Sequence, residues 1–433
     1  MKTNKSRKNR KILFISLGCD KNLVDSEKML GLLKEKGYEI TDDEEEADIV
    51  IINTCCFIND AKQESIDTIL EIAELRKNGN IQALVVMGCL AQRYKEEIQK
   101  EIPEVDVILG VGDVEEAISA LEEKRIVTTG GHYAYLKIAE GCDKHCTYCI
   151  IPKVRGSYRS IPMDSLIKEA KALAEGGVRE LILVAQEITV YGTDLYGEKR
   201  LSELLDRLCR IDGIHWIRLL YCYPEEIDDA LIRTMKREPK ICHYLDLPIQ
   251  HSCDNILKKM GRRTSSQELT AVIEKLRREI PDICIRTTLI TGFPGETKEE
   301  HEELKEFVDS MKFDRLGVFA YSQEEDTPAA SMPGQITEET KEERLAELME
   351  LQQDIAFEAA LSMKGKSLEA MIEGRIVDEG IYVARTYKDA PNVDGFLFIH
   401  TERELMTGDF VKVRITGANE YDLIGELEDE FTE

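Results

Sequence analysis

Short apolar runs alternate with segments of helical periodicity from Lys11 to Leu109. Four of the runs predict strands, at 11–17, 49–54, 83–87 and 105–109. Three segments between them predict helices, at 25–36, 61–77 and 92–102. Because strands that alternate with helices form a parallel sheet with helices on both faces, we predict an N-terminal α/β domain over residues 1–130.

Three cysteines, Cys19, Cys55 and Cys89, lie at or just past the carboxyl ends of the first three predicted strands. In a parallel sheet these ends lie along one edge, which is where open α/β folds bind ligands. A single cysteine at such a place is more often a buried structural residue, but the repeated placement predicts a three-cysteine metal site. Cys56 is a rival to Cys55, and we favour Cys55 because adjacent residues on a strand point in opposite directions.

A second group, Cys142, Cys146 and Cys149, follows directly after an apolar run at 135–139 that predicts a strand. The spacing lets three sulfurs face a common point, and three thiolates on a cubic iron–sulfur cluster leave one iron open to a substrate. The alternatives are a zinc site with His145 as fourth ligand, or a chance group of buried thiols. His145 would strain so tight a loop, and we therefore predict a cluster.

The chain carries a formal net charge of −27, from 84 acidic and 57 basic residues. This excess would repel a polyphosphate and favours a basic protein partner, unless it serves only solubility. Twelve cysteines without a secretory signal indicate a reducing, cytoplasmic compartment and the use of metal. No stretch approaches the ~20 apolar residues of a membrane span, so we expect no membrane partner.

The spacing of the second cysteine group, with Tyr148 before the last Cys, resembles the signature of the radical S-adenosylmethionine enzymes. In that family the open iron is chelated by the amino and carboxylate groups of S-adenosylmethionine, and one electron from the cluster yields a 5′-deoxyadenosyl radical. Taken with the first group, the whole chain resembles the methylthiotransferases. The motifs that carry this resemblance are 16–27, Asn53-Thr54-Cys55, Gly88-Cys89-Leu90 and the loop 141–149.

The resemblance implies two 4Fe-4S clusters. One would be held by the catalytic residues Cys142, Cys146 and Cys149. The other would be held by Cys19, Cys55 and Cys89, and would carry the sulfur to be transferred. The family ligand aligns with Cys55, and Cys56 stands where a Gly is usual.

Within this family, the motif 16–27 is most similar to the branch that modifies a ribosomal protein, although Pro usually stands where Asp20 is here. Asp20 adjoins the implied cluster ligand Cys19, which is itself unchanged. The implied substrate is an aspartate of the twelfth small-subunit ribosomal protein, modified at its β carbon. One S-adenosylmethionine would supply the methyl group and a second the radical. An electron donor and a sulfur donor are implied as further partners.

From 133 to 322 the strand–helix alternation occurs six times, with strands near Tyr135, Leu181, Trp216, Tyr244, Ile285 and Val318. Six such units resemble the open, partial (βα)6 barrel of radical enzymes, which we place at residues 131–364, with its chemistry at the carboxyl ends of the strands. The candidate contacts to S-adenosylmethionine are Tyr148, Gln186, Gln250, Arg286 and Gly292. Each Gln or Arg could equally be a polar residue that closes a strand, and the glycine could simply make a turn.

A long amphipathic helix at 338–364 precedes five short β-like runs. These runs predict a small antiparallel β-barrel over residues 365–433, which resembles the TRAM domain. TRAM domains often recognise RNA, but this segment holds seven Lys or Arg and sixteen Asp or Glu, so its charge is 7 minus 16, or −9. An RNA-binding barrel would have the opposite sign.

The sequence leaves two other functions open. The first is a transfer-RNA adenosine (C2) methylthiotransferase of the same family, which the acidic barrel and the context of 21–26 disfavour. The second is a non-catalytic iron–sulfur or zinc scaffold, which would not cleave S-adenosylmethionine.

Overall fold

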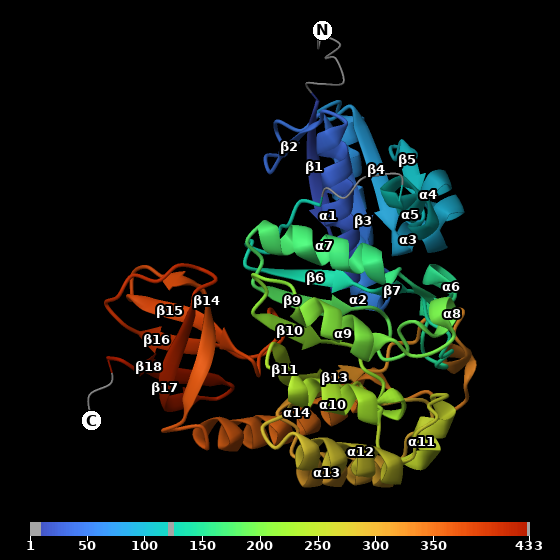
Figure 1. Ribbon diagram of the computed structural model, residues 1–433. Coiled ribbons are helices and arrows are strands. Elements are labelled where there is room, and N and C mark those ends of the chain that lie inside the picture. Colours follow the sequence, from blue (N-terminus) through green and yellow to red (C-terminus); the bar gives the residue numbers. More distant parts are fainter. Residues whose placement is uncertain (1–9, 120–124, 431–433) are drawn as a thin grey trace.

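The computed structural model describes residues 10–119 and 125–430. Its larger β-structures are a five-stranded sheet, a six-stranded sheet and a closed barrel, in that order along the chain. Figure 1 shows the N-terminal sheet above the central one, and the C-terminal barrel beside the central sheet. Among the described residues, no helix is both long and apolar enough to cross a membrane.

The N-terminal sheet has five parallel strands in the order β2-β1-β3-β4-β5. Four of them are the predicted strands: β1 (Lys11–Ser16), β3 (Ile49–Thr54), β4 (Ala83–Gly88) and β5 (Val107–Leu109). The fifth, β2 (Glu39–Thr41), lies at the edge and was not predicted, because three residues are too few for a periodic pattern. The central strand β3 is buried along its whole length, as expected for a parallel strand covered on both faces.

The helices of this region are α1 (Asp20–Glu35), α2 (Asn59–Lys77), α3 (Cys89–Arg93), α4 (Lys95–Glu101) and α5 (Val111–Ser119). The helix predicted at 25–36 begins earlier, directly after Cys19, and the one predicted at 92–102 is divided at Tyr94, whose φ of −121° is not helical. Gly18 (φ 90°) and Gly88 (φ 95°) make the turns from β1 into α1 and from β4 into α3. Cys19 and Cys89 therefore each stand at the start of a helix.

The central sheet contains all six predicted strands in the order β13-β12-β11-β10-β9-β6, and all are parallel. They are β6 (Tyr133–Lys137), β9 (Glu180–Val184), β10 (Trp216–Leu219), β11 (Ile241–Asp246), β12 (Cys284–Thr291) and β13 (Arg315–Ala320). The sheet is open, because β13 and β6 are its two edges. A short pair, β7 (Ala139–Glu140) and β8 (Arg159–Ser160), forms beside it.

Helices cover the outer face of this sheet (Figure 1). They are α7 (Met163–Glu175), α9 (Leu201–Cys209), α10 (Asp229–Arg237), α11 (Asp254–Lys259), α12 (Ser266–Glu279), α13 (Lys298–Met311) and α14 (Glu338–Leu361). The short helix α6 (Ile151–Arg155) instead packs with the N-terminal domain through Val154, and α8 (Thr193–Tyr196) lies beside β8. Alternate residues of each strand point to opposite faces, so Leu181 and Leu183 pack among these helices. Ile182 and Val184 instead pack with Val24 of α1 and with residues of the C-terminal barrel. Both neighbouring domains thus cover the inner face of the central sheet.

The C-terminal strands close into a barrel in the order β14-β15-β16-β18-β17. They are β14 (Ser367–Ile376), β15 (Ile381–Thr386), β16 (Leu397–His400), β17 (Phe410–Asn419) and β18 (Asp422–Leu427). The prediction of an antiparallel barrel is wrong for one pair, since β16 and β18 are parallel. β17 and β18 form a hairpin, and closure then requires β18 to lie beside β16 in the same direction.

Candidate active site

The loop 141–149 is folded back on the end of α6. Gly141 has φ 78°, and a β-carbon there would lie 2.1 Å from the Ser157 carbonyl oxygen, so only glycine fits without a shift of the backbone. The Cys142 N–H donates to the Gly156 carbonyl at 3.1 Å, and the Cys149 N–H donates to the Cys146 carbonyl at 3.0 Å. These contacts hold the three cysteines on one tight loop after β6 and β7.

The thiols of this loop are well shielded from water. Cys142 and Cys146 are buried and Cys149 is half-buried. Burial raises the pKa of Cys142 to about 11 and that of Cys149 to about 12, and the nearby Cys146 thiol raises both further. His145 is exposed, with φ 53°, so it does not join them.

A buried arginine lies beside this loop. The Arg262 side chain is 1% exposed, and its guanidinium lies 4.2 Å from the centroid of the Tyr223 ring. The Tyr223 hydroxyl in turn lies 3.7 Å from Sγ of Cys146. Nε and Nη1 of Arg262 are buried without a hydrogen-bond partner in the described part of the chain. Buried N–H groups without partners indicate a place for a polar ligand or for water beside this loop.

The three predicted N-terminal cysteines come together at the carboxyl edge of the first sheet. A β-carbon at Gly18 would lie 3.0 Å from Sγ of Cys55, so the turn before Cys19 lies against the Cys55 thiol. Cys89 Sγ lies 3.8 Å from Oδ1 of Asn22 in α1. Burial raises the pKa of Cys55, and the Cys19 thiol raises it further.

Cys55 and Cys56 both lie past the end of β3, and both are buried. Burial raises the pKa of both thiols, but the charges around them differ: Cys55 faces Cys19 and Arg155, whereas Cys56 faces Arg93. The Cys89 thiol has both as neighbours. Cys55 therefore differs from Cys56 in having the Cys19 thiol and Arg155 near it, whereas both residues are near Cys89.

In the described residues, no three His, Cys, Asp or Glu side chains are arranged so that they could hold a metal ion together. A cubic cluster makes a different demand, because each thiolate binds a separate iron at its own corner. Three thiols on each of two sites, with buried arginines beside them, provide donors of the kind that such clusters take.

Four charged side chains form a buried group between the two cysteine sites: Asp25, Lys137, Glu140 and Arg155. Glu140 Oε2 accepts from Arg155 Nη1 at 2.7 Å and from Lys137 Nζ at 2.8 Å. Burial opposes the ionisation of Glu140, but Lys137 and Arg155 hold its pKa below the usual range. Burial likewise opposes the charge on Lys137, but Asp25 and Glu140 hold its pKa above the usual range. Lys137 and Glu140 therefore stay charged at neutral pH.

Gln186, a predicted cofactor contact, lies two residues past β9 and reaches the cysteine loop. Its Nε2 donates to Glu140 Oε1 at 2.8 Å, while its own Oε1 is buried and lacks a partner in the described ranges. The neighbouring Glu187 also has a buried oxygen, Oε2, without a partner, and burial raises the pKa of Glu187 to about 7. Buried polar atoms without partners indicate a place for a polar ligand or for water.

The other predicted contacts are placed differently. Tyr148 packs against an apolar cluster that includes Phe293 and Cys253. Gln250 has φ 73° and is bonded through its backbone to β12 on both sides.

The last two predicted cofactor contacts, Arg286 and Gly292, already have other side chains of this chain beside them. Arg286 pairs with Asp246 at 3.0 Å and with Asp394 of the C-terminal barrel at 3.4 Å. The space beside Gly292 is filled by α14, because a β-carbon there would lie 2.3 Å from Cγ of Lys341.

Sequence reasoning missed the polar residues that surround the cysteines, namely the buried Asn22, Glu140, Arg155 and Arg262 and the half-buried Tyr223. Asn22 lies within a motif that was noticed for Cys19, which is the one signal that could have found it. Nothing local distinguishes Arg155 or Arg262 from the exposed basic residues beside them, Lys153 and Arg263.

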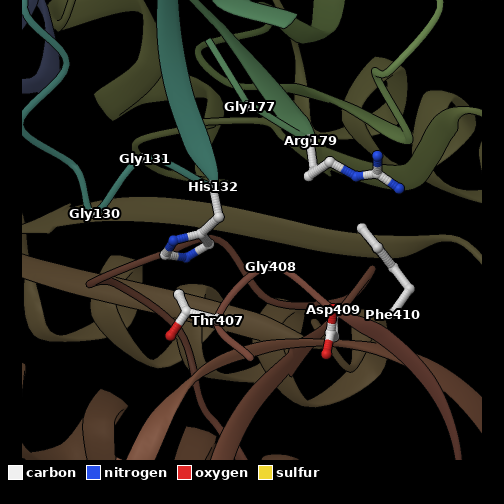
Figure 2. Close-up of a pocket in the computed structure, with 9 residues that line it drawn as sticks. All are labelled: Gly130, Gly131, His132, Gly177, Arg179, Thr407, Gly408, Asp409 and Phe410. Carbon is white, nitrogen blue, oxygen red and sulfur yellow. The ribbon is translucent and has the colours of Figure 1, made fainter. Parts of the chain in front are cut away.

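A hollow of about 490 Å³ lies between the central sheet and the C-terminal barrel (Figure 2). It is lined by Gly130, Gly131, His132, Gly177, Arg179, Thr407, Gly408, Asp409 and Phe410. Residues 130–132 precede β6 and the cysteine loop follows it, so the hollow lies at the opposite end of the strand from the cysteines. We assign it no part in the site.

The sequence matches three families in chain order: Uncharacterized protein family UPF0004 over residues 11–110, the Radical SAM superfamily over 136–308 and the TRAM domain over 365–427. It is 63% identical to the ribosomal protein uS12 methylthiotransferase RimO of Lachnoclostridium phytofermentans, across 96% of this chain and 100% of that protein. The chain belongs to the RimO family of radical S-adenosylmethionine methylthiotransferases. The protein of the same name from Clostridioides difficile is 49% identical across 96% of this chain and 98% of that one.

Membership of the RimO family confirms the predicted resemblance, and the Radical SAM match implies a 4Fe-4S cluster and S-adenosylmethionine as cofactors. Among solved structures, the radical S-adenosylmethionine methyltransferase TsrM from Kitasatospora setae aligns with a TM-score of 0.55. The alignment covers 74% of this chain and 77% of that one at 14% identity, so the likeness concerns the fold.

Proposed function

We propose that this chain inserts a methylthio group at the β carbon of an aspartate in the ribosomal protein uS12. The observation that carries the proposal is identity of 63% across the whole length of a protein named for that activity. The geometry supports it, because the two three-cysteine sites lie at the edges of neighbouring sheets. The buried charged group Asp25, Lys137, Glu140 and Arg155 lies between these two sites. We place the reaction in the cytoplasm, with an electron donor and a sulfur donor as further partners.

Cys142, Cys146 and Cys149 would hold the cluster that binds S-adenosylmethionine, and Cys19, Cys55 and Cys89 would hold the cluster that carries sulfur. With its cofactor bound, the first cluster supplies the electron that cleaves S-adenosylmethionine to a radical able to remove hydrogen from an unactivated carbon. The protein's part is to hold and shield these groups. Gln186 offers a buried oxygen to an N–H donor of the cofactor, and Tyr148 provides an apolar wall.

The charge of the C-terminal barrel supports a basic protein as substrate. Two of its seven basic side chains, Arg385 and Lys388, face inward and pair with Glu180 and Asp314 of the central domain. Asp389 and Asp394 of the barrel face inward too and pair with Arg315 and Arg286, so the acidic excess of the barrel remains on its outer face. Ribosomal proteins are usually basic because they neutralise RNA phosphates, whereas transfer RNA would be repelled.

The substrate is tested by mass spectrometry of uS12 and of transfer RNA after incubation with the anaerobically reconstituted enzyme, S-adenosylmethionine, a reductant and sulfide. We expect uS12 to gain one methylthio group in place of one hydrogen, at an aspartate, and transfer RNA to remain unmodified. A modified adenosine with unmodified uS12 would establish the transfer-RNA alternative. Failure to cleave S-adenosylmethionine at all would support the scaffold alternative.

The number of clusters is tested by the iron content. We expect reconstituted protein to carry about eight irons per chain, four for each cluster. Replacing Cys142, Cys146 and Cys149 together by Ala should leave about half of this iron, because the N-terminal cysteines are untouched. Iron content that fell to zero, or did not change, would contradict the assignment of two separate sites.

A further inference from the structure

The Arg155 side chain donates hydrogen bonds to a residue beside each of the two cysteine groups. It ends α6, the short helix that begins two residues after Cys149. Its Nη1 donates to Glu140, which immediately precedes Gly141 and Cys142, at 2.7 Å. Its Nη2 donates to Oδ1 of Asn22, in the first turn of α1 after Cys19.

Asn22 extends this link to all three N-terminal cysteines. Its Nδ2 donates to the carbonyls of Leu17, at 2.9 Å, and Thr54, at 3.0 Å, which lie just before Cys19 and Cys55. Its Oδ1, the atom that receives the hydrogen bond from Arg155, is the atom that lies 3.8 Å from Cys89 Sγ. The guanidinium of Arg155 is therefore linked to the N-terminal cysteines through Asn22 and to the loop 141–149 through Glu140.

The positive charge of Arg155 acts strongly on the nearby thiols because the group is buried. Arg155 is 3% exposed and Asn22 is 1% exposed, so water does little to screen the guanidinium from the thiols. Lys21 is also a cation near Cys19, but its ammonium lies over the ring of Tyr221, 3.3 Å from the centroid. Lys137 is directed to Asp25 and Glu140. Arg155 pairs with the same two carboxylates, but its Nη2 is also bonded to Asn22, so it is the cation that reaches the N-terminal group.

We propose that Arg155 is a positioning residue that ties the two cysteine loops together through Glu140 and Asn22, and that its charge raises the reduction potential of the cluster on Cys19, Cys55 and Cys89. The inference rests on the proposed function, because it assumes a cluster at that site. A fixed cation stabilises the more negative, reduced form of a nearby cluster more than the oxidised form. Removing the charge should therefore make the cluster harder to reduce.

The experiment uses the full chain with Cys142, Cys146 and Cys149 replaced by Ala, so that the only remaining cluster signal belongs to the N-terminal site. The midpoint potential is measured by electron paramagnetic resonance during a redox titration. At fixed potential we expect Arg155→Gln to lower the ratio of reduced to oxidised cluster about tenfold, which for one electron is a midpoint about 59 mV more negative. Arg155→Lys, which keeps the charge, should restore most of this shift.

Lys153→Gln is the matched control, because Lys153 is an exposed cation on the same helix and should leave the potential unchanged. Asn22→Asp provides a second route should Arg155→Gln not fold: it leaves Arg155 in place, adds a negative charge beside Cys89 and should also lower the potential. A merely structural ion pair would alter stability without moving the potential. An unchanged potential in Arg155→Gln would overturn the inference, as would an unchanged potential in Asn22→Asp should Arg155→Gln not fold. A parent protein without any cluster would instead overturn the two-cluster function.

Discussion

Replacing Cys146 by Ala is expected to abolish the cleavage of S-adenosylmethionine to 5′-deoxyadenosine. Cys146 lies at the centre of the loop, with its thiol beside Tyr223 and Arg262. Two thiolates cannot complete a site that needs three, and without the cluster no electron reaches the sulfonium. The measurement is chromatographic detection of 5′-deoxyadenosine after anaerobic incubation with a reductant.

Cys209→Ala serves as the matched control for this experiment. Cys209 is also a buried cysteine of the central domain, but it lies on α9 among the helices that cover the outer face. That variant should cleave S-adenosylmethionine at close to the wild-type rate. Cleavage at a similar rate by Cys146→Ala would show that the loop 141–149 does not hold the reacting cluster.

Replacing Cys55 by Ala should separate cleavage from product formation. The N-terminal site would lose a ligand while the loop 141–149 stays intact, so some S-adenosylmethionine should still be cleaved. We expect no detectable methylthio product, because the sulfur to be transferred would have no place to be held. Both quantities can be measured in one reaction, 5′-deoxyadenosine by chromatography and modified uS12 by mass spectrometry.

Cys56→Ala is the informative partner of that variant. Cys56 is adjacent, equally buried and close to Cys89, but it faces Arg93 where Cys55 faces Cys19. We expect Cys56→Ala to form product. Product from Cys55→Ala, with none from Cys56→Ala, would exchange the roles of the two residues.

The C-terminal barrel has a structural role beside its charge. Asp394, in the loop between β15 and β16, pairs with Arg286 of β12 and accepts a hydrogen bond from the Tyr244 hydroxyl at 2.7 Å. Asp389 of the same loop pairs with Arg315 at the edge of the central sheet. The barrel therefore helps to hold the inner face of the central sheet, on which the candidate cofactor contact Arg286 lies.

The sequence alone determined the longer strands, the spacing of the cysteines and the family resemblance. Strands and helices have local periodicities, so the six units of the central domain and the five runs of the barrel could be located correctly. Three cysteines within eight residues are a local signal, and so is a cysteine repeated at three strand ends, because sheet topology brings such ends together.

The tertiary structure decided which polar residues surround the cysteines and which predicted contacts have partners within the protein. Arg155 meets Asn22 across 133 positions, and Arg286 meets Asp394 across 108. No local pattern records such pairs, because a side chain's burial depends on what another part of the chain places over it. For the same reason, the filling of the space beside Gly292 by Lys341 and the parallel pairing of β16 with β18 could be known only once the chain had folded.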